Sequence, residues 1–263
     1  MGSVFETSLA LQPAGPGQWS AVASPRYEAV IGMFGGWTVA LLLKAVLAEP
    51  EATGTPISIT VNFVAAVPPG AALALHTTRL GVTRSLSHWR CDVKLAGDDA
   101  VLATALVIMA NRRDSDERTE LVMPDIVPPE ELEAFFPPFS KQPPLESRSA
   151  MPPPPFNKPD TRTLSWEKEA SGRAVDVLTL ALLSDLGAPR VYLVSAGPRP
   201  SATLTLSVTF LAGDAELAAC GDDFILSEMV ATRISQSIVG SRKAMWSRAG
   251  TLLATSEQLC WFR

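Results

Sequence analysis

The segment G-G-W-T-V-A-L-L-L-K-A-V-L-A, from Gly35 to Ala48, decides the fold of this chain. Its residues favour a helix, and Lys44 is the one charged residue among them, so the helix is apolar nearly all round. Such a helix has to be enclosed rather than laid on a surface. A curved antiparallel sheet wrapped around one helix encloses it, and we expect that arrangement here.

Strand-like runs follow this helix and are rich in Val, Ile, Thr and Leu with partial alternation. In the first half of the chain they are residues 57–65, 72–81, 86–95 and 100–109. The second half offers a similar helix candidate from Arg173 to Leu186. Its strand-like runs are residues 203–211, 223–233, 238–247 and 251–262.

The two halves are internal repeats. The string V-N-F-V-A from Val61 corresponds to V-T-F-L-A from Val208, and L-A-T from Leu102 corresponds to L-A-T from Leu253. Because the spacing grows by four residues between the matched strings, we expect one longer hairpin in the second copy. The shared order of one helix and several strands predicts an α+β fold of two tandem hot-dog units, each an antiparallel sheet wrapped around a central helix.

Proline divides the chain. Twelve of the 22 prolines fall between Pro124 and Pro159, where neither a helix nor a central strand can persist. We therefore predict an N-terminal hot-dog over residues 1–111, a Pro-rich linker outside the sheet over 112–160, and a C-terminal hot-dog over 161–263.

Composition excludes several classes of function. With 22 Lys and Arg against 27 Asp and Glu, the net charge of −5 leaves no basic footprint for nucleic acid. The chain has two histidines and three scattered cysteines, so no spacing suggests a metal site or a disulfide framework.

No targeting segment is apparent, and we expect a cytoplasmic protein. The first twelve residues lack the basic start and long apolar run of a signal peptide. The longest apolar stretch, 30–48, contains three glycines and Lys44 and is followed by Glu49-Pro50, which indicates a buried helix rather than a membrane span.

Three short motifs carry a family resemblance. They are Phe34-Gly35-Gly36 at the start of the first helix, T-R-S-L-S over 83–87, and L-A-T-S-E-Q over 253–258. In their joint order they resemble the double hot-dog acyl-CoA thioesterases, the thioesterase II-like group. That resemblance implies the double hot-dog fold, hydrolysis of an acyl-CoA or other acyl thioester in lipid metabolism, and no cofactor.

The resemblance also implies which residues act. In the family an Asp, a Thr and a Gln of the second hot-dog hold the attacking water, and the matching positions here are Asp185, Thr203 and Gln258. The first copy has Val107 where the repeat places Gln258, so one functional site per chain is expected.

Each residue also has a simpler interpretation. Asp185 lies in the last turn of an apolar helix that Gly187 can terminate, where the helix dipole disfavours a carboxylate, yet it could be a solvated residue at a helix end. Thr203 alternates with leucines like an ordinary strand residue. Gln258 lies in a strand suited to burial, where an unpaired amide is costly, but alternation leaves open that it faces solvent beside Glu257.

An oxyanion donor is expected at the start of the first helix. The N–H groups there are free and the helix dipole favours negative charge, so we assign the donor to the backbone N–H of Gly36. The alternative is that Gly35 and Gly36 only allow close packing of the helix against the sheet.

Other functions remain open. The chain could bind acyl thioesters without turnover, or be a hot-dog dehydratase or hydratase, although His76 and His88 stand alone and no Asp-His string is present. The sequence has no G-x-S-x-G elbow and no phosphate-binding glycine motif. Coenzyme A phosphates could meet an arginine, but the sequence does not choose among Arg79, Arg84, Arg112 and Arg113. A homo-oligomer is plausible, because sheet edges and faces often form interfaces.

Overall fold

The structure is a computed structural model that describes residues 2–134, 144–151 and 155–263. The elements of the first half are α1 (Val4–Ser8), β1 (Gln12–Gly15), β2 (Gln18–Val22), η1 (Pro25–Tyr27), α2 (Gly35–Leu47), β3 (Thr55–Phe63), β4 (Ala72–Val82), β5 (Leu86–Leu95) and β6 (Val101–Ala110). Those of the second half are η2 (Pro129–Glu131), β7 (Leu145–Ser149), β8 (Thr163–Glu169), α3 (Val177–Leu183), α4 (Arg190–Leu193), β9 (Ser201–Phe210), α5 (Asp214–Cys220), β10 (Ile225–Ser235), β11 (Ile238–Trp246) and β12 (Leu252–Phe262).

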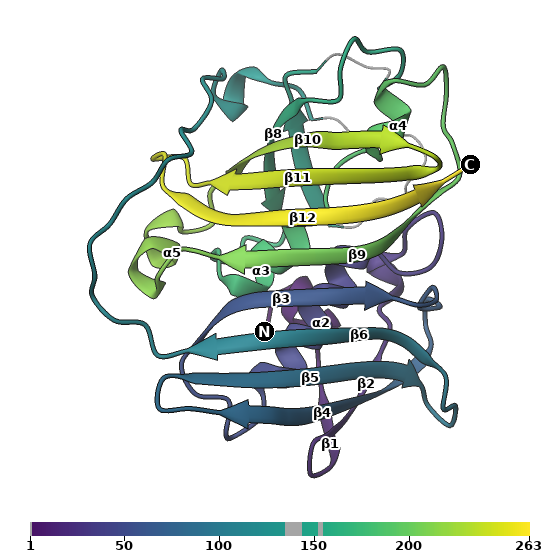
Figure 1. Cartoon of the computed structure of the whole chain (residues 1–263), viewed down its shortest axis with the longest axis vertical. Coiled ribbons are helices and arrows are strands. Elements are labelled where there is room, and N and C mark those ends of the chain that lie inside the picture. The colour runs from purple at the N-terminus through teal and green to yellow at the C-terminus, as the bar shows by residue number, and fades with distance from the viewer. Residues whose placement is uncertain (1, 135–143, 152–154) are drawn as a thin grey trace.

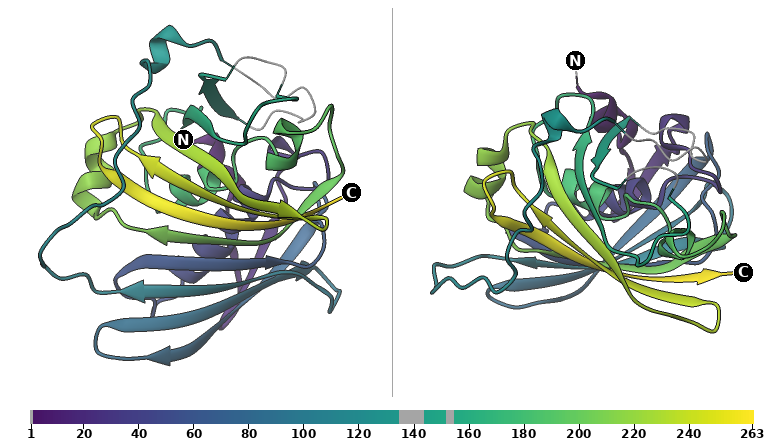
Figure 2. Two further views of the ribbon diagram at one scale, coloured as in Figure 1. Left: turned by 45° about the horizontal axis from the view of Figure 1, so that its top comes forward. Right: turned by 90° about the horizontal axis from the view of Figure 1, so that it is seen from above.

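The strands form one antiparallel sheet in the order β1-β2-β4-β5-β6-β3-β9-β12-β11-β10-β8-β7. Figure 1 shows β3 and β9 side by side in the middle of this sheet, with α2 and α3 behind it. The view from above in Figure 2 shows the sheet curving around these helices. The predicted double hot-dog fold is confirmed.

Helix α2 is enclosed as its composition predicts. Ten of its 13 residues are buried, and the side chains from Trp37 to Leu43 form the centre of the main hydrophobic core. No helix in the described part of the chain is long and apolar enough to cross a membrane.

The repeat is visible in the register of the sheet. Phe63 pairs with Ala103 in the first copy, and Phe210 pairs with Ala254 in the second, as the two matched strings require. Where the copies meet, Thr60 of β3 pairs with Ser207 of β9, its own counterpart 147 residues away. Their hydroxyl oxygens are 2.9 Å apart, so a local two-fold axis passes between them.

The longer hairpin expected in the second copy is wrong. The extra residues lie in the connection from β9 to β10. This connection contains the short helix α5, whereas the corresponding connection from β3 to β4 in the first copy contains no helix. Strands β9 and β10 are not neighbours in the sheet, so this connection is a crossover between separated strands and not a hairpin.

The sequence analysis also missed the outer strands of the sheet. Strands β1 and β2 extend the first half, and β7 and β8 extend the second half in the corresponding positions. Strand β7 lies inside the 112–160 segment, which we expected to stay outside the sheet, and it pairs with β8 from Leu145 to Ser149. Because prolines flank this run on both sides, the sequence analysis did not predict a strand here. An edge strand tolerates such neighbours, since its outer side needs no hydrogen-bonding partner.

Residues 123–132 of that segment cover part of the outer face of the second half. Met123, Ile126 and Leu132 pack on a separate hydrophobic cluster formed by Trp166, Leu226, Ala244 and Trp246. Their strand neighbours Ile225 and Met245 belong to the main core, so alternation places this cluster on the face away from α3. The Trp166 indole N–H donates to the carbonyl oxygen of Val127 at 2.9 Å, which fastens the segment to the sheet.

We predict that Trp166→Phe loosens this segment. The substitution removes a buried hydrogen bond and part of a buried ring, which should lower the free energy of unfolding by about 1–2 kcal/mol. Limited proteolysis should then cut within 112–132 faster than in the parent protein. Equal cleavage rates in the two proteins would show that the indole contact does not hold the segment.

Candidate active site

Asp185, Gln258 and Thr203 form one hydrogen-bonded chain. The Gln258 side-chain amide donates to Asp185 Oδ1 at 2.7 Å and to Thr203 Oγ1 at 2.8 Å. Asp185 lies in the segment after α3, Gln258 lies on β12, and Thr203 lies on β9, the strand that pairs with β12. The structure therefore brings together the three side chains that the sequence analysis singled out, and all three are partly buried.

A β-bulge aims Thr203 at this cluster. Gln258 pairs with Leu206, whereas Cys260, two residues further along β12, pairs with Thr203, so β9 has one extra residue here. The bulge turns Leu204 outward, where it is 37% exposed, and places Thr203 on the face that carries Gln258. Plain alternation would have put Thr203 on the opposite face.

Asp185 lies just beyond a helix that is shorter than expected. The candidate helix from Arg173 to Leu186 is cut to Val177–Leu183, because Asp176 caps its start by accepting from the Thr179 amide at 2.9 Å. At the other end, the Ser184 carbonyl accepts a hydrogen bond from Ser256 of β12. Asp185 is thus in a tight, anchored turn and not on a frayed helix end.

Burial raises the pKa of the Asp185 carboxyl from its ordinary value to about 6. Hydrogen bonds from Gly36 and Gln258 and the positive charge of Lys243 act in the opposite direction. A carboxyl group with this pKa is mostly ionised at neutral pH and is still basic enough to take a proton from water.

The Gly36 amide has a different partner from the one expected. Its N–H donates to Asp185 Oδ2 at 3.0 Å, so it holds the carboxylate and is not free to meet a substrate oxyanion. A Cβ at Gly36 would lie 2.1 Å from the Leu182 carbonyl oxygen, so the glycine is needed where α2 crosses α3. The glycine therefore allows close packing as the alternative expected, but against helix α3 and not against the sheet.

The first copy lacks the same groups at the symmetric position. The register gives Pro56 and Met109 as counterparts of Thr203 and Cys260, and the bulge recurs there. Val107 takes the place of Gln258 opposite Ile59. Neither Pro56 nor Val107 has a side-chain hydrogen-bonding group, so the chain carries this cluster once.

Sequence reasoning missed three polar residues beside the cluster. Lys243 and Glu167 are almost fully buried beneath α3 and form an ion pair of 2.6 Å. Ser241 pairs with Gln258 in the sheet, is 3% exposed, and its hydroxyl has no partner among the described residues. The repeat itself contained a signal for two of them. Lys243 and Ser241 are polar residues at the positions that correspond to Cys91 and Trp89 in the first copy.

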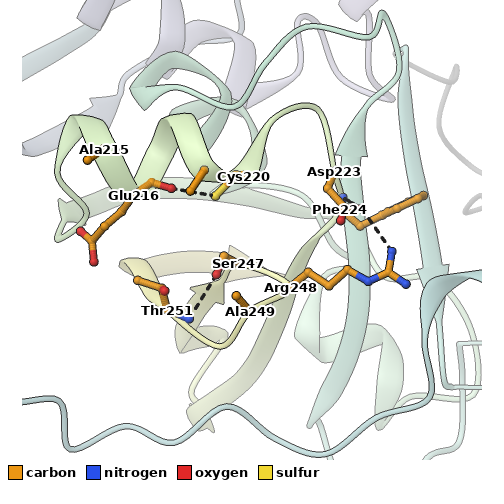
Figure 3. A pocket seen from close by; sticks show the side chains of 10 residues that line it. Ala215, Glu216, Cys220, Asp223, Phe224, Ser247, Arg248, Ala249 and Thr251 are labelled. Atoms are coloured by element: carbon orange, nitrogen blue, oxygen red, sulfur yellow. Dashed lines mark hydrogen bonds and ion pairs between the residues drawn. The ribbon is translucent and has the colours of Figure 1, made fainter.

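Two hollows on the surface of the described chain are not lined by Asp185, Thr203 or Gln258. One of about 590 Å³ lies between α5 and the loop joining β11 to β12 and is lined by residues such as Cys220, Phe224 and Arg248 (Figure 3). Another of about 670 Å³ lies beside Glu49 and Trp89. In the described part of the chain, no three His, Cys, Asp or Glu side chains gather as metal ligands would.

Three of the four arginines considered for coenzyme A, Arg79, Arg112 and Arg113, have protein partners. Arg79 forms an ion pair with Glu51 at 2.7 Å. Arg112 donates to the carbonyl oxygens of Phe210 and Leu211 and so ties the end of the first half to the second. The geometry singles out no arginine for a phosphate.

Fold and site together define a double hot-dog protein with a single carboxylate, amide and hydroxyl cluster where its halves meet. A family model for the acyl-CoA thioesterase N-terminal domain matches residues 23–110, and one for the C-terminal domain matches residues 118–262. The chain belongs to the acyl-CoA thioesterase family.

Solved structures resemble the whole chain. A conserved hot-dog protein of unknown function from Alicyclobacillus acidocaldarius is 30% identical, with a TM-score of 0.93 over 100% of this chain and 99% of that one. The TesB protein of Mycobacterium avium subspecies paratuberculosis is 20% identical, with a TM-score of 0.79 over 98% of each chain. Acyl-CoA thioesterase II of Mycobacterium marinum is 16% identical, with a TM-score of 0.79 over 99% and 98%. Among curated proteins, none matches the chain.

We predict that Gly36→Ala disturbs the helix crossing. Because the new Cβ would overlap the Leu182 carbonyl, the free energy of unfolding should fall by about 2–3 kcal/mol or more. Gly81→Ala is the matched control, since a Cβ there meets nothing within 4 Å. Urea unfolding of both variants measures the difference, and equal stability would contradict the tight crossing.

Proposed function

We propose that this chain is an acyl-CoA thioester hydrolase in which Asp185 activates the attacking water. The observation that carries the proposal is the ionisable carboxylate of Asp185, held by the Gly36 amide and Gln258 within a chain of the acyl-CoA thioesterase family. Its pKa of about 6 suits a general base at neutral pH.

The reaction follows from these groups. Asp185 takes a proton from water as the oxygen attacks the thioester carbonyl carbon, which gives a tetrahedral intermediate. The intermediate collapses, the carbon–sulfur bond breaks, and the protonated Asp185 returns its proton to the departing thiolate. The products are a carboxylic acid and free coenzyme A, and Asp185 is again ionised.

Gln258 and Thr203 orient the base and the water. Both N–H groups of Gln258 are used, one on Asp185 and one on Thr203, so the amide fixes the carboxylate in one rotamer. The Thr203 hydroxyl accepts from Gln258 and also contacts the Cys260 sulfur at 3.7 Å. Its hydrogen can turn from this weak acceptor to an incoming water oxygen.

The developing oxyanion needs another donor, because the Gly36 N–H bonds the carboxylate. We assign this role to the Gly35 N–H, the first amide of α2, which has no acceptor among the residues that the structure describes. It lies next to the base, since a Cβ at Gly35 would come within 2.5 Å of Asp185 Oδ2.

The dehydratase alternative is not favoured by the positions of the histidines. His76 and His88 lie on β4 and β5 of the first half, and their strand neighbours Leu75 and Trp89 are the residues that face the core. Both histidines therefore point away from the face that carries Asp185 and cannot form an Asp-His pair with it.

We further propose that the protein acts in the cytoplasm as a homo-oligomer. Leu86 and Leu106 remain 37% and 50% exposed on the outer sheet face of the first half, and no described segment covers them as residues 123–132 cover the second half. Analytical ultracentrifugation tests the assembly, and a monomer at micromolar concentration would contradict it.

The direct test is a panel of acyl-CoAs of different chain lengths with a thiol reagent that reports free coenzyme A. We expect release to depend on enzyme concentration and on Asp185. Binding of acyl-CoA without release would instead favour a non-catalytic acyl-thioester binding protein.

Asp185→Asn should lower kcat by about 10²–10⁴-fold, because the amide cannot take a proton. The fold should remain intact, since Asn keeps an oxygen that can accept from Gly36 or Gln258. Glu257→Gln, on the exposed neighbour of Gln258, is the control and should keep parent activity.

The pH dependence follows from the raised pKa of Asp185. The ionised form is active, so kcat/KM should be constant near neutral pH and fall about tenfold per pH unit below about pH 6. An acid limb close to the ordinary aspartate pKa would show that another group is the base.

A further inference from the structure

A complete ion pair is buried under the helix that leads to Asp185. Lys243 and Glu167 are 2% and 3% exposed, and the Lys243 ammonium donates to Glu167 Oε2 at 2.6 Å. It also donates to the carbonyl oxygens of Leu183 at 2.6 Å and Leu186 at 2.8 Å. Three acceptors use the three N–H donors that only a protonated lysine has.

Glu167 is held in turn by its own strand neighbours. Ser227 of β10 donates its hydroxyl to the same Oε2 atom at 2.8 Å. Burial raises the pKa of Glu167 and lowers the pKa of Lys243, and each charge counteracts the shift of the other. The pair is therefore costly to bury unless both partners stay together.

The fold does not require this pair. In the first copy, the counterpart of Lys243 is Cys91 and the counterpart of Glu167 is Ala21. The strand pairs that establish this are Cys91 with Ala105 and Lys243 with Ser256, and Ala21 with Leu73 and Glu167 with Ile225. The same sheet position under α2 is thus filled by Cys91 and Ala21, which are uncharged and buried. A charged pair appears only in the copy that carries the cluster.

Lys243 also marks the place where the two central helices differ. Helix α2 runs for 13 residues, whereas α3 has seven and ends at Leu183. The lysine binds the carbonyl of that last helical residue and the carbonyl of Leu186. Asp185 lies between these two anchored residues, so its backbone position depends on Lys243.

We propose that Lys243, held by Glu167, is a positioning residue that ends α3 and fixes the turn from which Asp185 reaches Gln258 and the Gly36 amide. The proposal rests on the hydrolase function proposed above. Lys243 does not touch the reacting atoms; it acts through the position and the ionisation of Asp185.

The charge of Lys243 is part of this role. Its cation lowers the pKa of Asp185 against the opposite effect of burial. The other charged or titratable groups near the two residues are Glu167 of β8, Arg190 of α4 and the Cys260 thiol of β12. Removing the cation should therefore shift the Asp185 pKa upward and require a higher pH for the ionised base.

The first experiment replaces the pair by apolar residues, as in the first copy. Lys243→Met/Glu167→Leu removes both charges of the pair together, and the buried Arg190 keeps its hydrogen bonds to Thr161, Thr163 and Ala188. The protein should therefore remain folded by circular dichroism. We expect kcat at about pH 7 to fall at least about tenfold, the acid limb of kcat/KM to move up by about one pH unit, and activity to recover partly above about pH 8. Arg90→Met, which removes the cation of the Arg90–Asp92 pair on β5, should change neither quantity.

A second variant predicts the opposite shift. Glu167→Gln removes an anion near Asp185, while the Leu183 and Leu186 carbonyls and the Asp185 charge still favour the protonated lysine. The acid limb should therefore move to lower pH. A purely structural role would not shift the limb in opposite directions. Shifts of the same sign, or no shift in either variant, would overturn the proposal.

An NMR titration separates this proposal from the hydrolase function. The carbon-13 carboxyl signal of Asp185, assigned by its loss in Asp185→Asn, reports the pKa without turnover. We expect the same opposite shifts in the two variants. If the parent protein releases no coenzyme A, the hydrolase proposal fails, and this titration still confirms or overturns the role of Lys243.

Discussion

The crossing of α2 over α3 is the constraint on which the rest of the structure depends. Gly36 allows the helices to approach until its α-carbon faces the Leu182 carbonyl, and its N–H then reaches the Asp185 carboxylate. Any side chain at this position would separate the helices. The β3 and β9 pairing supports the approach from the sheet side, because Thr60 and Ser207 meet on the local two-fold axis. Neither half could build the site alone.

Duplication explains how the site could become polar without losing the fold. The first copy keeps apolar or uncharged side chains on the inner sheet face, including Cys91 and Val107, and so preserves a core under α2. The second copy has Lys243 and Gln258 at those positions and gives them partners within hydrogen-bonding distance. Buried polar groups are tolerated when every one is satisfied, and here they meet at one end of one helix. The first copy keeps an apolar core under α2, and the second copy carries the polar cluster.

The β-bulge in β9 shows how a small backbone irregularity serves the site. It changes which face Thr203 occupies, and without it the threonine would alternate onto the outer face of the sheet. The first copy has the same bulge at Pro56, where it presents no hydroxyl. The irregularity is therefore a property of the duplicated fold, and the side chain placed on it distinguishes the two copies.

The sequence by itself determined the enclosed helix from Gly35, the repeat and the double hot-dog fold, because apolar periodicity and matched strings depend on residues close together in the chain. Family resemblance pointed to Asp185, Thr203 and Gln258. Only the tertiary structure decided that they touch, that Gly36 bonds Asp185, that an edge strand lies within 112–160, and that Lys243 bonds the carbonyl of the last residue of α3. These outcomes depend on contacts between distant residues, and neither local propensity nor alternation contains the register or the bulge that creates those contacts.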